Sequence, residues 1–455
     1  MSRKLVLIGA GSTVFTQRLV ADLIKMPRPE DWELALVDID AYTLESVELL
    51  VKKMLATGGA DIKVTVSTDR RDVLPGADVV VSTIAVGGRR GWETDVVVPR
   101  KYGIYQPVGD TVMPGGISRA MRMIPAMVAM AEDVKALCPR AHFFNYANPM
   151  TANCRAIHKA TGVPVIGLCH GLGYVEGQIA SFLEVPRQDV RSIGVGLNHL
   201  TFITDLFYQG QNAWPMARAK LAEQRPDLER ELAEKTEFPN GVSGRPERYS
   251  DQPFAWNFFL QRGVFPCAMD RHATEFFPER FPGGQYYGKT LGVDAFPIDK
   301  RIAYGDEQYV QMDEFARSDA PLTTEDLAQV PGEHEDLLDI IDSLYGDGRR
   351  VFSVNMVNGG AVPNLPDWAV LELPAAATGR GFIPLSLGPL REDLAAIIRR
   401  KLDSIEITVD AALSGDEGLF VEALLADGAV TERSMARDLA AELIQAHKEH
   451  LPQFA

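Results

Sequence analysis

The stretch Lys4-Leu5-Val6-Leu7-Ile8-Gly9-Ala10-Gly11-Ser12 decides how the rest of this chain is interpreted. Its apolar first half is typical of a buried parallel strand, and the residues from Val14 to Lys25 have the apolar spacing of a helix. A strand, a glycine turn and a helix N-terminus together bind pyrophosphate, because backbone N–H groups and the helix dipole face the anion. Gly9, Gly11, Ser12 and Thr13 are therefore candidate dinucleotide contacts, with Ser12 and Thr13 as possible helix caps. Val14 stands where a third glycine would complete the motif, so a simple tight turn is the alternative.

A second buried strand is predicted from Trp32 to Ile39, and it carries Asp38 near its end. An acid at this point of a dinucleotide fold binds the adenosine ribose hydroxyls, and it would repel a ribose phosphate. Asp38 therefore favours NAD over NADP, the alternative being a solvated acid that starts a turn.

The composition restricts the class of protein. A chain of 455 residues can hold two domains, and its formal charge of −16 argues against binding to nucleic acid or to an anionic membrane. We find no twenty-residue apolar run and no signal peptide, so we expect a cytoplasmic protein without a membrane segment. Four cysteines do not make a disulfide framework at this length.

Strands and helices alternate over the first part of the chain, and the pattern changes near Gly196. We therefore predict an α/β protein with a Rossmann-type doubly wound parallel sheet over residues 1–195. Residues 196–455 should form a second, mixed α+β domain. Two amphipathic helices, Arg391 to Ala412 and Arg433 to His447, should close the chain.

Cys169 and His199 are the most informative pair of residues. Cysteine and imidazole are both ligands of borderline transition metals, and Cys169 follows a predicted strand at the expected cofactor edge. His170 adds a titratable group beside it. A buried structural cysteine and an ordinary histidine are the alternative.

Three further segments place polar residues near the same edge. Asn148-Pro149 follows a buried strand and either forms a simple turn or directs an amide at a sugar hydroxyl. Asp110-Thr111 with Pro114-Gly115-Gly116 is interpreted as a loop, which could cover a nicotinamide. Asp270-Arg271-His272 with Glu275 gathers ionisable residues between apolar ones, and a solvated turn is the alternative.

The chain resembles the NAD-dependent family 4 glycoside hydrolases, which include alpha-glucosidases, alpha-galactosidases, uronidases and 6-phosphoglycosidases. The matching pieces occur in the family's order over about four-fifths of the chain. They are Gly9 to Ser12, Asp38, Pro114 to Gly116, Asn145 to Pro149, Cys169-His170, Asn198-His199, Val354-Asn355, Asn358-Gly359, Leu365-Pro366 and Val370 to Pro374.

The resemblance implies an enzyme with NAD and a divalent metal, usually manganese, and a homodimeric or homotetrameric assembly. It also implies that residues 196–455 are the domain that binds metal and substrate and builds the oligomer. It implies that Cys169 and His199 are the protein ligands of the metal and that Asn148 contacts the sugar, next to NAD. The implied reaction hydrolyses alpha-glycosides of unphosphorylated hexoses or hexuronic acids. It proceeds by oxidation at C3, deprotonation at C2, elimination and addition of water, unlike two-carboxylate glycosidase chemistry.

The family's base lies in a poorly matching loop, here Arg248-Tyr249-Ser250-Asp251-Gln252-Pro253. Asp251 is the first candidate and Tyr249 the second, while His170 is the candidate general acid. Arg119, Arg248 and Arg271 could hold a uronate carboxylate or form structural ion pairs, and His272 is a further candidate substrate contact.

Two other classes of protein remain as alternatives. A malate- or lactate-type 2-hydroxy-acid dehydrogenase would share the dinucleotide fold, would need no metal thiolate and would consume NAD stoichiometrically. A non-catalytic NAD sensor would have little use for Cys169 and His199.

Overall fold

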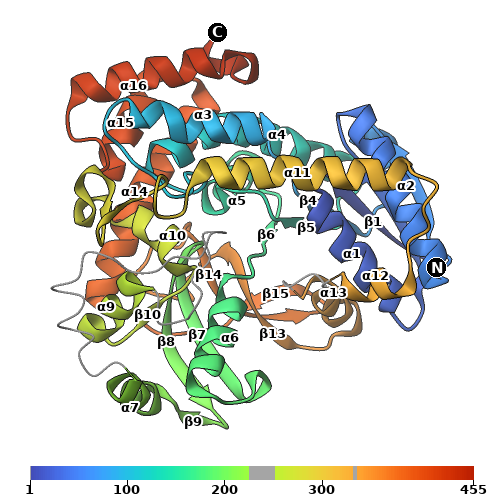
Figure 1. Ribbon diagram of the computed structural model, residues 1–455, viewed down its shortest axis with the longest axis horizontal. Helices are drawn as coiled ribbons and strands as arrows, with labels where there is room; N and C mark the ends of the chain where they lie inside the picture. Colours follow the sequence, from blue (N-terminus) through green and yellow to red (C-terminus); the bar gives the residue numbers. More distant parts are fainter. Residues whose placement is uncertain (1, 225–251, 331–335) are drawn as a thin grey trace.

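The structure, a computed structural model, describes residues 2–224, 252–330 and 336–455 (Figure 1). Its main feature is one sheet of thirteen strands. The main path runs β10-β8-β7-β14-β13-β6-β5-β4-β1-β2-β3, and two further strands lie off it, with β9 paired to β8 and β15 paired to β14. Among the helices of these residues, none is long and apolar enough to cross a membrane.

The N-terminal half of the sheet is parallel and has the predicted doubly wound order β3-β2-β1-β4-β5-β6. Its strands are short, and they are mostly buried because helices cover both faces, except for the edge strand β3, which is partly exposed. The strands are β1 (Arg3–Ile8), β2 (Trp32–Val37), β3 (Lys63–Ser67), β4 (Val79–Ser82), β5 (His142–Asn145) and β6 (Ile166–Gly167). The Rossmann-type half of the fold prediction is confirmed.

Six helices connect or follow these strands: α1 (Thr13–Lys25), α2 (Ala41–Gly58), α3 (Gly88–Arg100), α4 (Met113–Leu137), α5 (Met150–Thr161) and α6 (Gly171–Leu183). The interpretation of Pro114-Gly115-Gly116 as a loop is wrong, because these residues form the first turn of α4. A proline is favourable there because its missing N–H would be unpaired anyway. The glycines allow close packing, since a Cβ on Gly116 would lie 2.3 Å from the carbonyl carbon of Thr111.

The C-terminal half continues the same sheet with antiparallel strands. β13 (Arg350–Val357) pairs with β6 at Asn355 and Gly167, and β14 (Val370–Thr378) links β13 to β7 (Val190–Leu197). The remaining strands are β8 (Leu200–Tyr208), β9 (Gln211–Asn212), β10 (Phe265–Pro266) and β15 (Gly381–Pro384), with the separate pair β11 (Gln285–Tyr286) and β12 (Lys289–Thr290). The mixed second half agrees with the predicted architecture, while a domain boundary at residue 195 stays a prediction.

Helices from the second half pack back on the first (Figure 1). α14 (Glu392–Ser414) contacts α4 and α5, and α11 (Ile298–Arg317) lies along α2 and α3. The two predicted C-terminal helices are present as α14 and α16 (Arg433–Ala446), with α15 (Glu417–Asp427) between them. The other helices are α7 (Trp214–Gln224), α9 (Pro253–Arg262), α10 (Met269–Ala273), α12 (Thr324–Gln329) and α13 (Leu337–Gly346).

Candidate active site

The glycine turn after β1 has the geometry of a dinucleotide site. Gly9 adopts a left-handed conformation with φ of +93°, and a Cβ there would lie 2.8 Å from the amide nitrogen of Ile84. The amides of Gly9 and Ala10 both donate to the carbonyl oxygen of Val37, at 2.8 and 2.9 Å. Only glycine fits the first position, and the turn is tied to the ends of β2 and β4.

Asp38 lies against this turn. Its Oδ2 accepts a hydrogen bond from the amide of Gly11 at 2.8 Å, and a Cβ on Gly11 would come within 2.7 Å of the same oxygen. Ser12 is the N-cap residue of α1, but its side chain makes no capping bond to the described residues, so the predicted serine cap is absent. Thr13 begins the helix rather than capping it. The N–H groups at the start of α1 therefore have no side-chain acceptor from Ser12, which suits an anion site.

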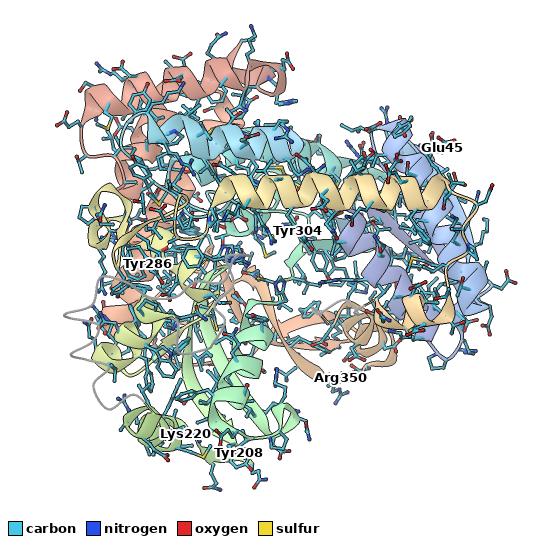
Figure 2. All side chains as sticks on the ribbon, viewed as in Figure 1. Glu45, Tyr208, Lys220, Tyr286, Tyr304 and Arg350 are labelled. Carbon is cyan, nitrogen blue, oxygen red and sulfur yellow. The ribbon has the colours of Figure 1, made fainter. Side chains whose placement is uncertain are left out.

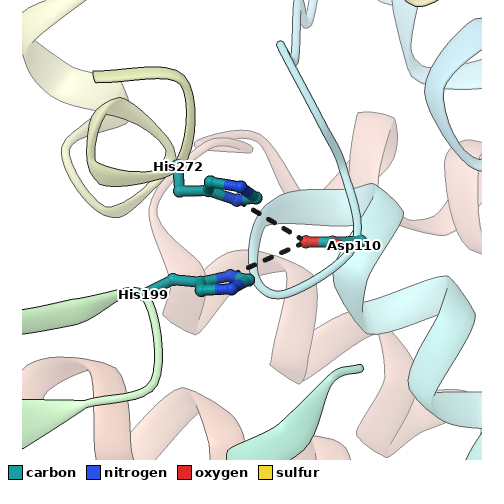
Figure 3. A group of neighbouring side chains, drawn as sticks. All are labelled: Asp110, His199 and His272. Carbon is teal, nitrogen blue, oxygen red and sulfur yellow. Dashed lines mark ion pairs between the residues drawn. The ribbon is translucent and has the colours of Figure 1, made fainter. Parts of the chain in front are cut away.

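Three side chains that could hold a metal converge beyond the carboxyl edge of the sheet: Asp110, His199 and His272 (Figure 3). One ligand atom from each lies within 4.8 Å of the other two. Asp110 Oδ1 is 3.9 Å from His199 Nδ1 and 4.0 Å from His272 Nδ1, and the two rings lie 4.0 Å apart. A carboxylate and two imidazoles are ligands of zinc, manganese and related divalent ions.

Local backbone geometry brings the histidines to this point. His199 lies in the tight connection between β7 and β8 with a left-handed φ of +67°, and His272 lies on the short helix α10. The hydroxyl of Thr111 and His199 Nδ1 are joined by a hydrogen bond of 2.8 Å. A bulky residue with positive φ is strained, and such strain is found where a side chain must be aimed at a site.

Both imidazoles are held in the neutral form. Burial lowers the pKa of His199 to about 4, with Arg271 and His170 adding repulsion and Asp110 opposing them. Burial lowers the pKa of His272 well below its usual value, and the electrostatic influence of neighbouring basic groups, among them Arg271, acts in the same direction. A neutral imidazole has a free nitrogen lone pair, so both residues can bind a cation at neutral pH.

Glu275 holds the segment that carries Asp110. Its carboxylate oxygen Oε1 accepts hydrogen bonds from the amides of Val108 and Gly109, at 2.8 and 2.6 Å, and the side chain is 1% exposed. Burial, followed by the charge of Asp110, raises the pKa of Glu275 well above its usual value. The solvated turn that was the alternative for this cluster is absent, since Asp270 and Glu275 are both 1% exposed.

Asn148 lies beside Asp110. Its Nδ2 donates to Asp110 Oδ2 at 3.0 Å, and Arg119 Nε donates to the backbone oxygen of Asn148 at 3.0 Å. Asn148 Oδ1 is buried and has no hydrogen-bond partner among the described residues. Burial lowers the pKa of Arg119. An amide oxygen left open beside a charged group is suited to accept a bond from a ligand hydroxyl.

Cys169 follows β6, and the amide of Gly171 at the start of α6 donates to its Sγ at 3.4 Å. A helix N-terminus favours the thiolate form of a cysteine. Cys169 is not a member of the Asp110, His199 and His272 group, so the predicted pairing of Cys169 with His199 on one metal stays a prediction. His170 is exposed, and its charge acts on both histidines of that group.

The remaining predicted residues are placed as follows. Arg271 precedes His272 on α10, and its charge lowers the pKa of both histidines. Asp251 and Tyr249, the candidate bases, and Arg248 lie outside the described residues.

Sequence reasoning did not assign Asp110 or Glu275 a role, although it singled out both segments. It gave no role to Glu372, whose Oε2 accepts a 2.7 Å hydrogen bond from Thr201 and whose pKa burial raises to about 7. The sequence did offer one signal for Glu372, because an acidic residue within an apolar strand is costly to bury without a reason.

Several polar atoms around this edge are buried without a hydrogen-bond partner from the described residues. They include Asn148 Oδ1, His272 Nδ1 and both side-chain polar atoms of Asn198 and Asn355. Buried polar groups are nearly always paired in folded proteins. A concentration of open donors and acceptors around the three side chains that could hold a metal fits a site for a polar ligand and a cation.

Comparison with known proteins gives matches along almost the whole chain. The sequence model of the family 4 glycosyl hydrolases matches residues 4–185, and that of the family 4 glycosyl hydrolase C-terminal domain matches residues 194–430. An alpha-galacturonidase from Bacillus subtilis (strain 168) is 30% identical, with 97% of each chain covered. An alpha-galactosidase from Rhizobium meliloti (strain 1021) is 28% identical, and the match covers 100% of this chain and 90% of that protein.

Among solved structures, the 6-phospho-beta glucosidase from Thermotoga maritima, with manganese, NAD+ and glucose-6-phosphate, has the same fold. The TM-score is 0.77, the sequence identity is 22%, and the match covers 98% of this chain and 99% of that one.

Proposed function

Because this chain belongs to glycosyl hydrolase family 4, we propose that it is an NAD- and divalent-metal-dependent glycosidase. Its substrates are alpha-glycosides of unphosphorylated hexoses or hexuronic acids, in line with the galactosidase and galacturonidase relatives. The observation that carries the proposal is the group of Asp110, His199 and His272. This group lies at the carboxyl edge of the same sheet whose strand β1 ends in the dinucleotide turn.

The residues of the turn fit NAD. The N–H groups at the start of α1 and the close-packed backbone of Gly9 and Gly11 accommodate a pyrophosphate. The carboxylate of Asp38, oriented by the amide of Gly11, is placed to accept from ribose hydroxyls and to repel a 2′-phosphate.

The donor set also fits a divalent cation, with manganese as the proposed metal. His199 and His272 are neutral, Asp110 supplies a negative charge, and Cys169 remains a proposed ligand from the adjoining strand end. When bound, NAD supplies a reversible hydride acceptor and the metal supplies Lewis acidity toward sugar oxygens.

The protein's own groups orient the sugar and move protons. Asn148 Oδ1 accepts from a sugar hydroxyl while its Nδ2 stays bonded to Asp110, which fixes the direction of the amide. His170 donates a proton to the leaving oxygen at C1, and Asp251 or Tyr249 removes the proton from C2. Arg119, Arg271 and His272 are the proposed further contacts of the sugar.

Assembly and location are part of the same proposal. We expect a homodimer or homotetramer in the cytoplasm, where a reducing environment would keep Cys169 able to bind metal; none of the four cysteines is in a disulfide.

The test is an incubation with NAD, Mn2+ and a thiol reductant on a panel of p-nitrophenyl alpha-glucoside, alpha-galactoside, alpha-glucuronide and alpha-galacturonide. We expect one or more sugars to be released without net formation of NADH. In D2O the released sugar should carry deuterium at C2, because the proposed route exchanges that hydrogen. In a parallel incubation with malate or lactate, stoichiometric NADH, together with no sugar release from the panel, would support the 2-hydroxy-acid dehydrogenase. NAD binding without turnover in either incubation would support a sensor.

A further inference from the structure

Helix α11, which comes from the second half of the chain, reaches helices on both faces of the parallel sheet. β1, β2 and β3 follow one another toward one side of this sheet, and β4, β5 and β6 toward the other. Because crossovers between parallel strands are right-handed, α1 and α2 cover one face while α3 and α4 cover the opposite face. α11 contacts both α2 and α3 (Figure 1). It must therefore pass over an edge of the sheet to reach both layers.

The contacts of Tyr309 on α11 show which edge is crossed. Its hydroxyl and Thr43 Oγ1 are joined by a hydrogen bond of 2.8 Å, and the guanidinium of Arg89 lies 5.6 Å from the centre of its ring. Thr43 and Arg89 are in the first turns of α2 and α3, which follow the carboxyl ends of β2 and β4. β1 lies between these two strands, and a Cβ on Gly11 in its turn would lie 2.8 Å from Thr43 Cγ2. α11 therefore passes beside the dinucleotide turn, at the edge of the sheet where ligands bind.

Interlocking contacts fasten α11 to α2. Asp313 accepts hydrogen bonds from the hydroxyls of Ser46 and Tyr42, the second at 2.9 Å. Arg317 donates to Glu45 at 2.9 Å, and its guanidinium lies 4.0 Å from the centre of the Tyr42 ring (Figure 2). This end of α11 is held by several side chains that share partners.

Exposed ion pairs join α11 to α3. Asp306 accepts a 2.6 Å hydrogen bond from Arg89 Nε, and it also pairs with Arg90. The side chains of Arg89 and Asp306 are 40% and 39% exposed. Exposed ion pairs are weak and are screened by salt, so the contact with α3 opens more easily than the contact with α2.

We propose that α11 is a cover over the adenosine end of NAD, fixed to α2 and latched to α3 by Asp306, and that it slows release of the cofactor. The adenosine half of a dinucleotide extends from the turn to the acid after β2, which is Asp38 here, and α11 spans this part of the edge. In the proposed reaction NAD accepts a hydride and returns it to the same sugar, so release between the two steps would leave an oxidised sugar. This benefit rests on the proposed function, whereas the cover itself requires only that the chain binds NAD.

The test measures how fast NADH leaves the protein. Protein loaded with NADH is mixed with excess NAD in a stopped-flow instrument, and the loss of NADH fluorescence gives the dissociation rate. Asp306→Ala removes both ion pairs to α3, and Tyr309→Phe removes the hydrogen bond to α2 without changing any charge.

Two matched controls lie on the same helix. Glu307→Ala removes the neighbouring carboxylate, which accepts a hydrogen bond from within α11. Tyr304→Phe removes the hydroxyl of a tyrosine that is 54% exposed (Figure 2). We expect Asp306→Ala to raise the dissociation rate about fivefold and Tyr309→Phe about threefold, while both controls stay within about twofold of the original.

A rate unchanged in both variants, with both proteins folded by circular dichroism, would overturn the cover while leaving the NAD site and the glycosidase assignment intact. Equal acceleration in the variants and their controls would also overturn it, because a general loosening of α11 would then explain the release. An unmodified protein that binds no NADH would remove the cover together with the NAD part of the proposed function. The expected rates in a protein that cleaves no glycoside would support the cover and contradict the glycosidase.

Discussion

Replacing Glu275 by alanine should destabilise the protein and loosen its metal site. Glu275 Oε1 accepts from the amides of Val108 and Gly109, and Asp110 is the next residue of that segment. Removing the carboxylate leaves two buried N–H groups without an acceptor, and each costs about 1–3 kcal/mol. Burial of the Glu275 carboxyl group is unfavourable, as its raised pKa shows. The alanine variant no longer buries this group, which offsets part of the loss. The net expectation is a loss of about 2–4 kcal/mol of unfolding free energy.

Glu275→Gln separates the hydrogen bonds from the charge. A glutamine carbonyl can still accept from both amides, and it resembles the protonated carboxyl group that the raised pKa favours. We expect a loss below about 1 kcal/mol for this variant. Because Asp110 depends on the clamp for its position, Mn2+ should bind at least tenfold more weakly to Glu275→Ala, and nearly as well to Glu275→Gln.

Urea titration with tryptophan fluorescence as the readout measures the free energy of unfolding, and isothermal titration calorimetry measures the affinity for Mn2+. An alanine variant as stable as the original protein, with the same Mn2+ affinity, would refute the role of Glu275. If Glu275→Gln lost as much stability and Mn2+ affinity as Glu275→Ala, the charge of the carboxylate, rather than its hydrogen bonds from the two amides, would hold the segment in place.

Three other changes test separate parts of the site. Asp38→Ala should lower the ratio of the dissociation constant for NADP to that for NAD at least tenfold. Equal binding of the two dinucleotides by the unmodified protein would contradict the role of Asp38. Cys169→Ser should weaken Mn2+ binding and abolish turnover, while the affinity for NAD changes less than twofold. Near-normal activity of this variant after chelator treatment would exclude Cys169 as a metal ligand. Glu372 has a folded-state pKa of about 7, above its unfolded value, so its contribution to stability falls as pH rises from about 4.5 to about 7, by about 3 kcal/mol. Glu372→Gln should remove this slope in urea titrations at pH 5 and pH 8, and an unchanged slope would place the titration elsewhere.

Much of the N-terminal half could be predicted because its signals are local. A run of apolar residues, a glycine turn and an amphipathic helix are contiguous from Lys4 to Lys25, and the structure contains them as β1 and α1. The start of α4 was missed because Pro114-Gly115-Gly116 usually indicates a turn. Here the proline occupies the first helical turn, and the glycines pack against Thr111.

The burial of Glu275 was missed for a related reason. A run of ionisable residues is most often solvated, and its sequence does not show that two backbone amides from a distant segment will satisfy the carboxylate.

The sequence by itself determined the doubly wound half, the dinucleotide turn and the acid that faces it, because each depends on neighbours along the chain. Only the tertiary structure decided that Asp110, His199 and His272 meet. They come from the segment before α4, the β7–β8 connection and α10, and they converge because β13 pairs with β6 and carries β14 and β7 onto the same sheet. Pairing between strands far apart in the chain depends on which edges and faces fit together in three dimensions. The local spacing of apolar residues predicts the type of each element and its buried face, but it does not predict which distant strand will be its partner.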